Sequence, residues 1–210
     1  MSGHKAVIFD CDGVLFESRQ ANLAYYNRIL AQFSYPRITA HDRERAHLCH
    51  TASSEGVLAG LLRPDDVAAA LAFAATLDYR EFIPLMTPEP GLREMLEVMS
   101  RHYPLAVATN RGSSATSVLA HFDLHRYFSV VVTSRDVTAP KPAPDMLLLA
   151  ARHLDCDPEA CLFVGDSELD QMAAGSGAVS FIGYGSYWSQ PPAVGHHFEL
   201  LDYLGLPRPV

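Results

Sequence analysis

The strongest constraint on the fold is a repeated pattern of short, continuous apolar runs separated by helix-like stretches. Runs of this kind occur at residues 5–10, 104–109, 128–133, 161–166 and 178–182. They are rich in β-branched and aromatic residues, as is typical of strands buried on both faces of a parallel sheet. Helical patterns lie at residues 90–102, 113–122, 144–154 and 168–174, the last closed by Gly175. This alternation predicts an α/β fold, a doubly wound parallel sheet forming a Rossmann-like core.

Residues 17–86 interrupt the alternation, because they contain helix signals and no strand-like run. Leu23, Tyr26 and Leu30 fall on one helical face. Helix starts are indicated by Thr39 with Asp42, which resembles a capping box for a helix to about His50, by Ser53 or Ser54, and by Pro64. We therefore predict a catalytic core of residues 1–16 and 87–210, with residues 17–86 inserted as an all-helical cap subdomain.

The charge balance narrows the range of partners. The net charge is −8, from 16 basic and 24 acidic side chains, which argues against nucleic acid or an anionic membrane as a partner. No stretch approaches the ~20 apolar residues of a membrane span, and the N-terminal residues lack the apolar core of a secretory signal. The 4 cysteines form no CxxC pair, which suits reduced thiols. We expect a cytoplasmic protein; the sequence leaves its oligomeric state open, with a monomer preferred.

Two carboxylates follow the first strand directly. Asp10 and Asp12 flank Cys11, and alternation along an extended backbone points both toward the same side. Gly13 permits a tight exit from the strand. In open α/β sheets, ligands bind outside the carboxyl ends of the strands. The pair is therefore a candidate catalytic site, although a solvated turn would also explain these residues taken alone.

The other strand ends carry complementary polar groups. Thr109, Asn110 and Arg111 precede a helix start, which offers a hydroxyl and backbone N–H groups to an anion. Lys141 lies between two prolines that stiffen its position. Asp166 and Asp170 are four residues apart and face one cleft if a helix begins after Asp166. Together these residues supply carboxylates for a hard divalent cation such as Mg²⁺, and a hydroxyl and a positive charge for a phosphoryl group.

These segments, DxDGVL at Asp10 and GDSxxD at Asp166 above all, resemble the motifs of the haloacid dehalogenase superfamily, in its phosphoglycolate phosphatase and β-phosphoglucomutase-like branch. The resemblance implies that Asp10 is the nucleophile and Asp12 the general acid and base. It implies that Thr109 and Lys141 hold the phosphoryl oxygens. We also take Asn110 and Arg111, which follow Thr109 directly, as candidate phosphate-binding residues. The resemblance also implies that Mg²⁺ is bound by Asp166, the Asp10 carboxylate and the Asp12 backbone carbonyl, with Asp170 as a ligand or a support.

Two further expectations concern the acid and the cap. Neighbouring carboxylates would raise the pKa of Asp12, which suits a residue that donates and later accepts a proton. In the cap, Arg43, His47 and His50 share one helical face. We favour the interpretation that these three form a solvated polar face. The alternative hypothesis is that they form a stripe that contacts the substrate and determines specificity.

The sequence thus predicts a Mg²⁺-dependent phosphatase that hydrolyses a small phosphorylated metabolite through an aspartyl-phosphate. A sugar phosphomutase shares every catalytic residue, and the sequence does not separate the two. A receiver-type signalling module is a weaker alternative, because receivers carry the phosphoacceptor at the third strand and lack a cap. A dehalogenase is disfavoured, because its chemistry needs no acidic residue at the position of Asp12. A binding protein without catalytic activity would not explain why every strand end carries a suitable polar residue.

Overall fold

The computed structural model describes residues 3–185, 188 and 190–209. Its main sheet has the strand order β5-β4-β1-β6-β7-β8, and every neighbouring pair is parallel. The strands are β1 (Ala6–Phe9), β4 (Leu105–Thr109), β5 (Val130–Thr133), β6 (Cys161–Gly165), β7 (Ser180–Tyr184) and β8 (Ala193–Val194). The predicted α/β fold class is therefore confirmed, with each predicted strand present and β8 added at one edge.

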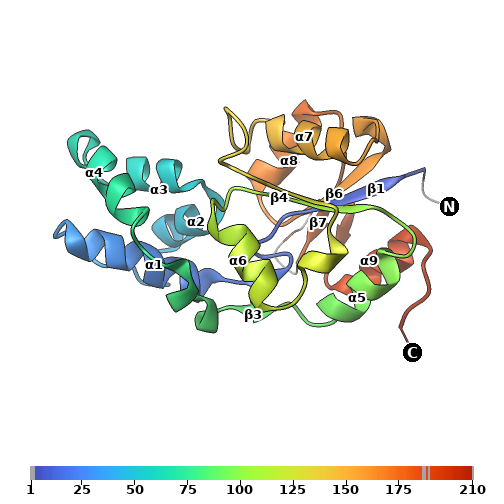
Figure 1. Ribbon diagram of the computed structural model, residues 1–210, viewed down its shortest axis with the longest axis horizontal. Coiled ribbons are helices and arrows are strands. Elements are labelled where there is room, and N and C mark those ends of the chain that lie inside the picture. Colours follow the sequence, from blue (N-terminus) through green and yellow to red (C-terminus); the bar gives the residue numbers. More distant parts are fainter. Residues whose placement is uncertain (1–2, 186–187, 189, 210) are drawn as a thin grey trace.

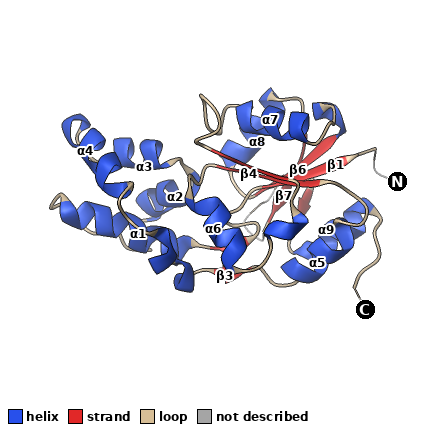
Figure 2. Cartoon of the chain, viewed as in Figure 1, coloured by secondary structure: helices blue, strands red, loops and turns tan. Residues whose placement is uncertain are grey.

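Helices cover both faces of this sheet (Figures 1 and 2). One face packs on α5 (Leu92–Met99), α6 (Ser114–His121) and α9 (His197–Leu204), the other on α7 (Asp145–His153) and α8 (Glu168–Ser176). Strand β1 shows why the sheet is buried on both sides: Val7 and Phe9 join the first hydrophobic cluster, whereas Ala6 and Ile8 join the second. This alternation leaves the carboxyl ends of the strands as the place for polar groups.

Helices α1 (Arg19–Gln32), α2 (Arg43–Thr51), α3 (Ser54–Leu61) and α4 (Pro64–Ala74) lie to one side of the sheet, and we call them the cap (Figure 1). The cap has its own hydrophobic cluster, which includes Ile29, Leu30 and Leu58. Shorter 3₁₀ helices are η1 (Tyr79–Glu81), η2 (Ile83–Leu85), η3 (His125–Tyr127) and η4 (Pro158–Ala160). The cap joins the core through β2 (Phe16–Glu17) and β3 (Thr87–Pro88), an antiparallel pair absent from the sequence prediction.

Helix boundaries differ in two places from the sequence prediction. Asp42, rather than Thr39, caps α2, because its side chain accepts a hydrogen bond from the Arg45 N–H. Helix α8 continues through Gly175 and ends at Ser176; the following Gly177 is its C-cap, whose N–H is bonded to the carbonyls of Ala173 and Ala174. Ser53, one of the two residues proposed for the start of α3, is its N-cap. Among the described residues, no helix is long and apolar enough to cross a membrane.

Candidate active site

A buried lysine links two carboxylates at the carboxyl end of the sheet. Lys141 Nζ lies 2.7 Å from Asp10 Oδ1 and 2.6 Å from Asp170 Oδ1. Asp10 directly follows β1, and Asp170 lies in the first turn of α8, so the lysine joins two segments that are distant in sequence. The second oxygen of Asp170 accepts hydrogen bonds from Ser167 N (3.1 Å) and Oγ (2.6 Å) in a capping box that fixes the start of α8. Both oxygens of Asp170 are therefore engaged by protein groups.

Three of the predicted carboxylates form a cluster with the chemistry of a metal site. Asp10, Asp166 and Asp170 each contribute an oxygen, and these oxygens lie within 4.8 Å of one another. Burial, together with the neighbouring carboxylates, outweighs the opposing effect of Lys141 and raises the pKa of Asp10 to about 7. A divalent cation with oxygen ligands would relieve this accumulation of negative charge. The donor set therefore fits Mg²⁺.

Gly13 and Gly165, at the carboxyl ends of β1 and β6, allow the carboxylates to approach. Gly13 has φ +82°, and a Cβ atom there would lie 2.0 Å from Asp166 Oδ2. A Cβ on Gly165 would lie 2.5 Å from Asp170 Cβ. The lack of a side chain at both positions is therefore a requirement of the cluster, and Gly13 also needs a left-handed backbone that glycine adopts without strain.

Asp12 lies apart from this cluster, in a buried ion pair with Arg111. Arg111 Nε donates to Asp12 Oδ2 at 3.0 Å, and its Nη2 donates to Asp12 Oδ1. Burial by itself raises the pKa of Asp12, but Arg111, aided by His50 and Ser18, outweighs that effect and the pKa falls to about 2. The expectation of a raised pKa is wrong for this arrangement, because the nearest charge is a guanidinium rather than another carboxylate.

Residues that the sequence analysis did not single out complete the surroundings of Asp12. Ser18 Oγ donates to Asp12 Oδ1, and Asn22 Nδ2 lies 3.3 Å from the same oxygen. Tyr79 donates to Asn22 Oδ1 at 2.8 Å, and its ring lies 4.5 Å from the Arg111 guanidinium carbon. Ser18 and Asn22 are four residues apart at the start of α1, a spacing that places them on one helical face. That spacing was the only local signal of their shared role.

Thr109 and Asn110, at the end of β4, have different hydrogen-bond partners. Thr109 is buried, lines the cavity described below, and its Oγ1 accepts a hydrogen bond from the Arg111 N–H at 3.1 Å. The Asn110 side chain is bonded to the backbone of Lys141 and of Thr51 in the cap. The side chains of Arg111 and Asn110 are thus bonded to protein groups, and both residues also line the cavity. Their place beside the phosphoryl group stays a prediction.

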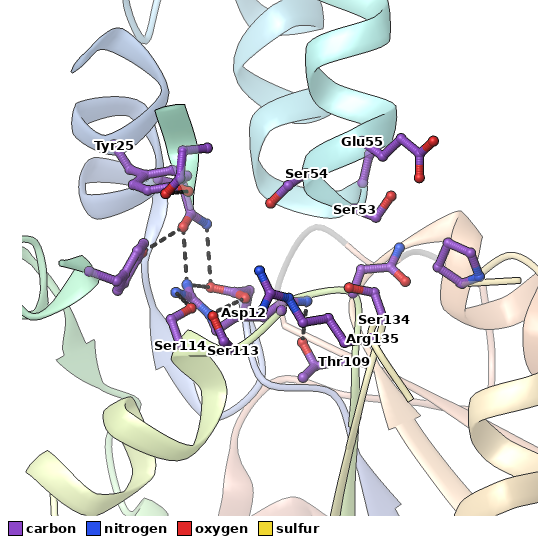
Figure 3. Close-up of a pocket in the computed structure, with 18 of the residues that line it drawn as sticks. Asp12, Tyr25, Ser53, Ser54, Glu55, Thr109, Ser113, Ser114, Ser134 and Arg135 are labelled. Atoms are coloured by element: carbon purple, nitrogen blue, oxygen red, sulfur yellow. Dashed lines mark hydrogen bonds and ion pairs between the residues drawn. The ribbon is translucent and has the colours of Figure 1, made fainter. Parts of the chain in front are cut away.

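A cavity of about 340 Å³ lies between the cap and the core. Asp10, Asp12 and Thr109 line it from the strand ends. Figure 3 shows that hydroxyl groups surround it, from Ser53 and Ser54 in the cap and from Ser113, Ser114 and Ser134 in the core. The cavity is therefore polar, is of a size for a small molecule, and gives access to Asp10.

The three cap residues of the predicted stripe have different environments. His50 is buried, and its Nε2 lies 3.6 Å from Asp166 Oδ2. His47 is exposed beside Glu168, and Arg43 is exposed. Within the described part of the chain, His50 lines the cavity whereas Arg43 and His47 do not. One of the three thus faces the site, and the other two lie on a solvated surface.

Comparison with known proteins identifies the family. A family model described as haloacid dehalogenase-like hydrolase matches residues 7–184. The chain belongs to this family. One relative, the phosphorylated carbohydrates phosphatase of Thermotoga maritima, is 30% identical over 180 residues, which cover 85% of this chain and 83% of that protein. The phosphoglycolate phosphatase of Escherichia coli K12 is 36% identical over 121 residues, which cover 53% of this chain and 48% of that protein.

Solved structures of haloacid dehalogenase-like proteins share the whole fold. A subfamily IA, variant 1 hydrolase of this superfamily from Geobacter sulfurreducens has a TM-score of 0.82 at 40% identity, covering 95% of this chain and 99% of that chain. A putative β-phosphoglucomutase from Thermotoga maritima has a TM-score of 0.70 at 27% identity, covering 96% and 98%. The family match and the phosphatase relatives establish the chain as a phosphoric monoester hydrolase of the haloacid dehalogenase-like type.

Proposed function

We propose that this haloacid dehalogenase-like hydrolase is a Mg²⁺-dependent phosphatase that acts on a small phosphorylated metabolite through an aspartyl-phosphate on Asp10. The observation that carries the proposal is the Asp10 carboxylate, which opens onto the cavity and lies 2.7 Å from Lys141 Nζ beside Asp166 and Asp170. A carboxylate attacks an anionic phosphoryl group only when negative charge on both is offset. Lys141 supplies part of that offset.

The predicted Mg²⁺ ligands differ in how many of their oxygens already accept hydrogen bonds from protein groups. Asp10 and Asp166, with the Asp12 backbone carbonyl, would hold Mg²⁺. Asp166 Oδ2 has longer contacts, 3.6 Å to His50 and 4.0 Å to Arg19, whereas Asp170 is hydrogen-bonded through both oxygens. Asp170 therefore serves as a support that positions Lys141 and α8. The cation, when bound, would neutralise charge on the phosphoryl oxygens.

In the first step an Asp10 oxygen forms a bond to phosphorus, and the bond from phosphorus to the ester oxygen breaks. Thr109 and Lys141 hold the phosphoryl oxygens, and Asp12 gives its proton to the departing ester oxygen. In the second step water attacks the aspartyl-phosphate, Asp12 takes the proton from that water, and phosphate leaves Asp10 unchanged. Asp12 is ionised in its pair with Arg111. Before the first step we therefore expect the guanidinium to release an Asp12 oxygen, and that oxygen to take up from solvent the proton that it later donates.

The cavity favours a phosphorylated carbohydrate or a related hydroxylated metabolite as substrate. Its hydroxyl groups, from Ser53, Ser54, Ser113, Ser114 and Ser134, suit a ligand with several polar groups. A relative that covers most of the chain is a phosphorylated carbohydrates phosphatase, which supports the same class. The second candidate function is a sugar phosphomutase, favoured by the likeness to a putative β-phosphoglucomutase at 27% identity.

A panel of phosphorylated carbohydrates and small phosphorylated acids, assayed with Mg²⁺, tests the proposal. We expect inorganic phosphate release from one or a few esters, abolished by Asp10→Asn and by chelation of the metal. Isomerisation of a sugar phosphate without net phosphate release would favour the mutase. Phosphate release that persists undiminished in Asp10→Asn would exclude the proposed nucleophile.

A further inference from the structure

Within the described structure, the Asn110 side chain is hydrogen-bonded both to the backbone of Lys141 and to the cap. It directly follows β4 and is buried. Its Oδ1 accepts from the Lys141 N–H at 3.0 Å, and its Nδ2 donates to the Lys141 carbonyl at 3.1 Å and to the Thr51 carbonyl at 3.0 Å. The two donors of the carboxamide therefore serve two different parts of the chain.

The backbone N–H and carbonyl of Lys141 are both hydrogen-bonded to this carboxamide. Pro140 and Pro142 have no N–H, so Lys141 carries the sole backbone donor of the three residues. Asn110 pairs with both the N–H and the carbonyl of Lys141, much as a neighbouring strand would. Because the backbone of Lys141 is held in this way, its ammonium is directed to the position between Asp10 and Asp170.

The third hydrogen bond reaches the end of a cap helix. Thr51 is the last residue of α2, where backbone carbonyls have no partner within the helix. Asn110, 59 residues away in sequence, supplies the missing donor. The preceding residue, His50, lies against Asp166. The end of α2 therefore contacts two strand tips, and one of the contacts is shared with the Lys141 segment.

We propose that Asn110 is a positioning residue: through its three hydrogen bonds, the position of the cap over the core determines how firmly Lys141 is held. When the cap lies over the core, all three hydrogen bonds of Asn110 are made and the carboxamide is fixed. When α2 moves away, a buried donor loses its partner, and the pair with Lys141 is less constrained. The inference rests on the proposed function only for the catalytic role of Lys141. The coupling between the cap and Lys141 is structural and does not depend on that role.

Asn27 provides a matched control. Within the cap its Nδ2 donates to the Ile38 carbonyl and its Oδ1 accepts from the Ile38 N–H, each at 2.8 Å. Asn27→Ala therefore removes the same kind of paired carboxamide without touching the core. Asn110→Ala and Asn27→Ala are compared with the wild type for kcat, KM and hydrogen exchange, the latter at the Lys141 amide and at residues 49–54.

For Asn110→Ala we expect kcat to fall about tenfold to a hundredfold with a much smaller change in KM. Hydrogen exchange should be faster at both segments, whereas Asn27→Ala should leave kcat and the Lys141 amide unchanged. Unchanged exchange at either segment in Asn110→Ala would overturn the coupling, as would an equal kcat loss in Asn27→Ala. If the wild-type enzyme released phosphate from no ester, the proposed function would fail, and the exchange measurement would still decide the coupling.

Discussion

The buried pair of Asp12 and Arg111 makes a quantitative prediction about stability. Their side chains are 9% and 4% exposed, and Arg111 contacts both carboxylate oxygens. The pKa of Asp12 falls from 3.8 to about 2; since one pKa unit corresponds to about 1.4 kcal/mol, the site favours the ionised form by about 2 kcal/mol. Removing Arg111 leaves a buried charge whose burial alone raises the pKa, so the loss is larger, about 3–5 kcal/mol.

A double-mutant cycle measures this interaction. Arg111→Met and Asp12→Asn are made singly and together, and the free energy of unfolding is obtained from urea denaturation near neutral pH. Each single variant leaves an unpaired buried partner, whereas the double variant leaves none. We expect the double variant to lose at least about 2 kcal/mol less than the sum of the two single losses. Additivity within about 0.5 kcal/mol would refute the conclusion that Arg111 is the dominant partner of Asp12.

Two other variants test separate parts of the structure. Gly13→Ala places a methyl group where Asp166 Oδ2 lies; we expect Mg²⁺ affinity, measured by calorimetric titration, to fall by about tenfold or more, and unchanged affinity would contradict the role of this glycine. Burial lowers the pKa of His197 from 6.5 to about 4, so between these pH values the unfolded chain binds a proton that the folded chain does not. The free energy of unfolding therefore falls as pH decreases through this window, by up to about 3 kcal/mol. His197→Phe keeps an aromatic ring against Tyr184 and should lose less stability than the wild type between about pH 7 and pH 4.5 in urea denaturation; parallel losses would contradict the burial argument.

The strands and the carboxylate cluster were predictable because they follow from local patterns. An apolar run that ends in an acid, as at Phe9–Asp10, marks both a buried strand and its carboxyl end. The strands β2 and β3 have two residues each, too few for a period to show, and their pairing depends on the cap between them. Sequence reasoning therefore missed this strand pair, although it placed the ends of the cap close to it.

The surroundings of Asp12 were not predictable for a related reason. Arg111 is 99 residues from Asp12. The local sequence TNRG at residues 109–112 does not indicate whether the arginine side chain faces a ligand or the end of another strand. Sequence reasoning listed Arg111 as a phosphate-binding candidate and did not foresee that its guanidinium pairs with Asp12. The sign of the Asp12 pKa shift was wrong as a consequence, since it depends on which charge lies nearest.

The central claim is that the carboxylate of Asp10 accepts the phosphoryl group. The most direct test is rapid acid quenching of the enzyme during turnover of an ester identified in the panel, followed by mass spectrometry of its peptides. We predict a mass increase of one phosphoryl group on the peptide that contains Asp10, absent from Asp10→Asn. Turnover with the phosphoryl group on another residue, or undiminished turnover in Asp10→Asn, would contradict the account.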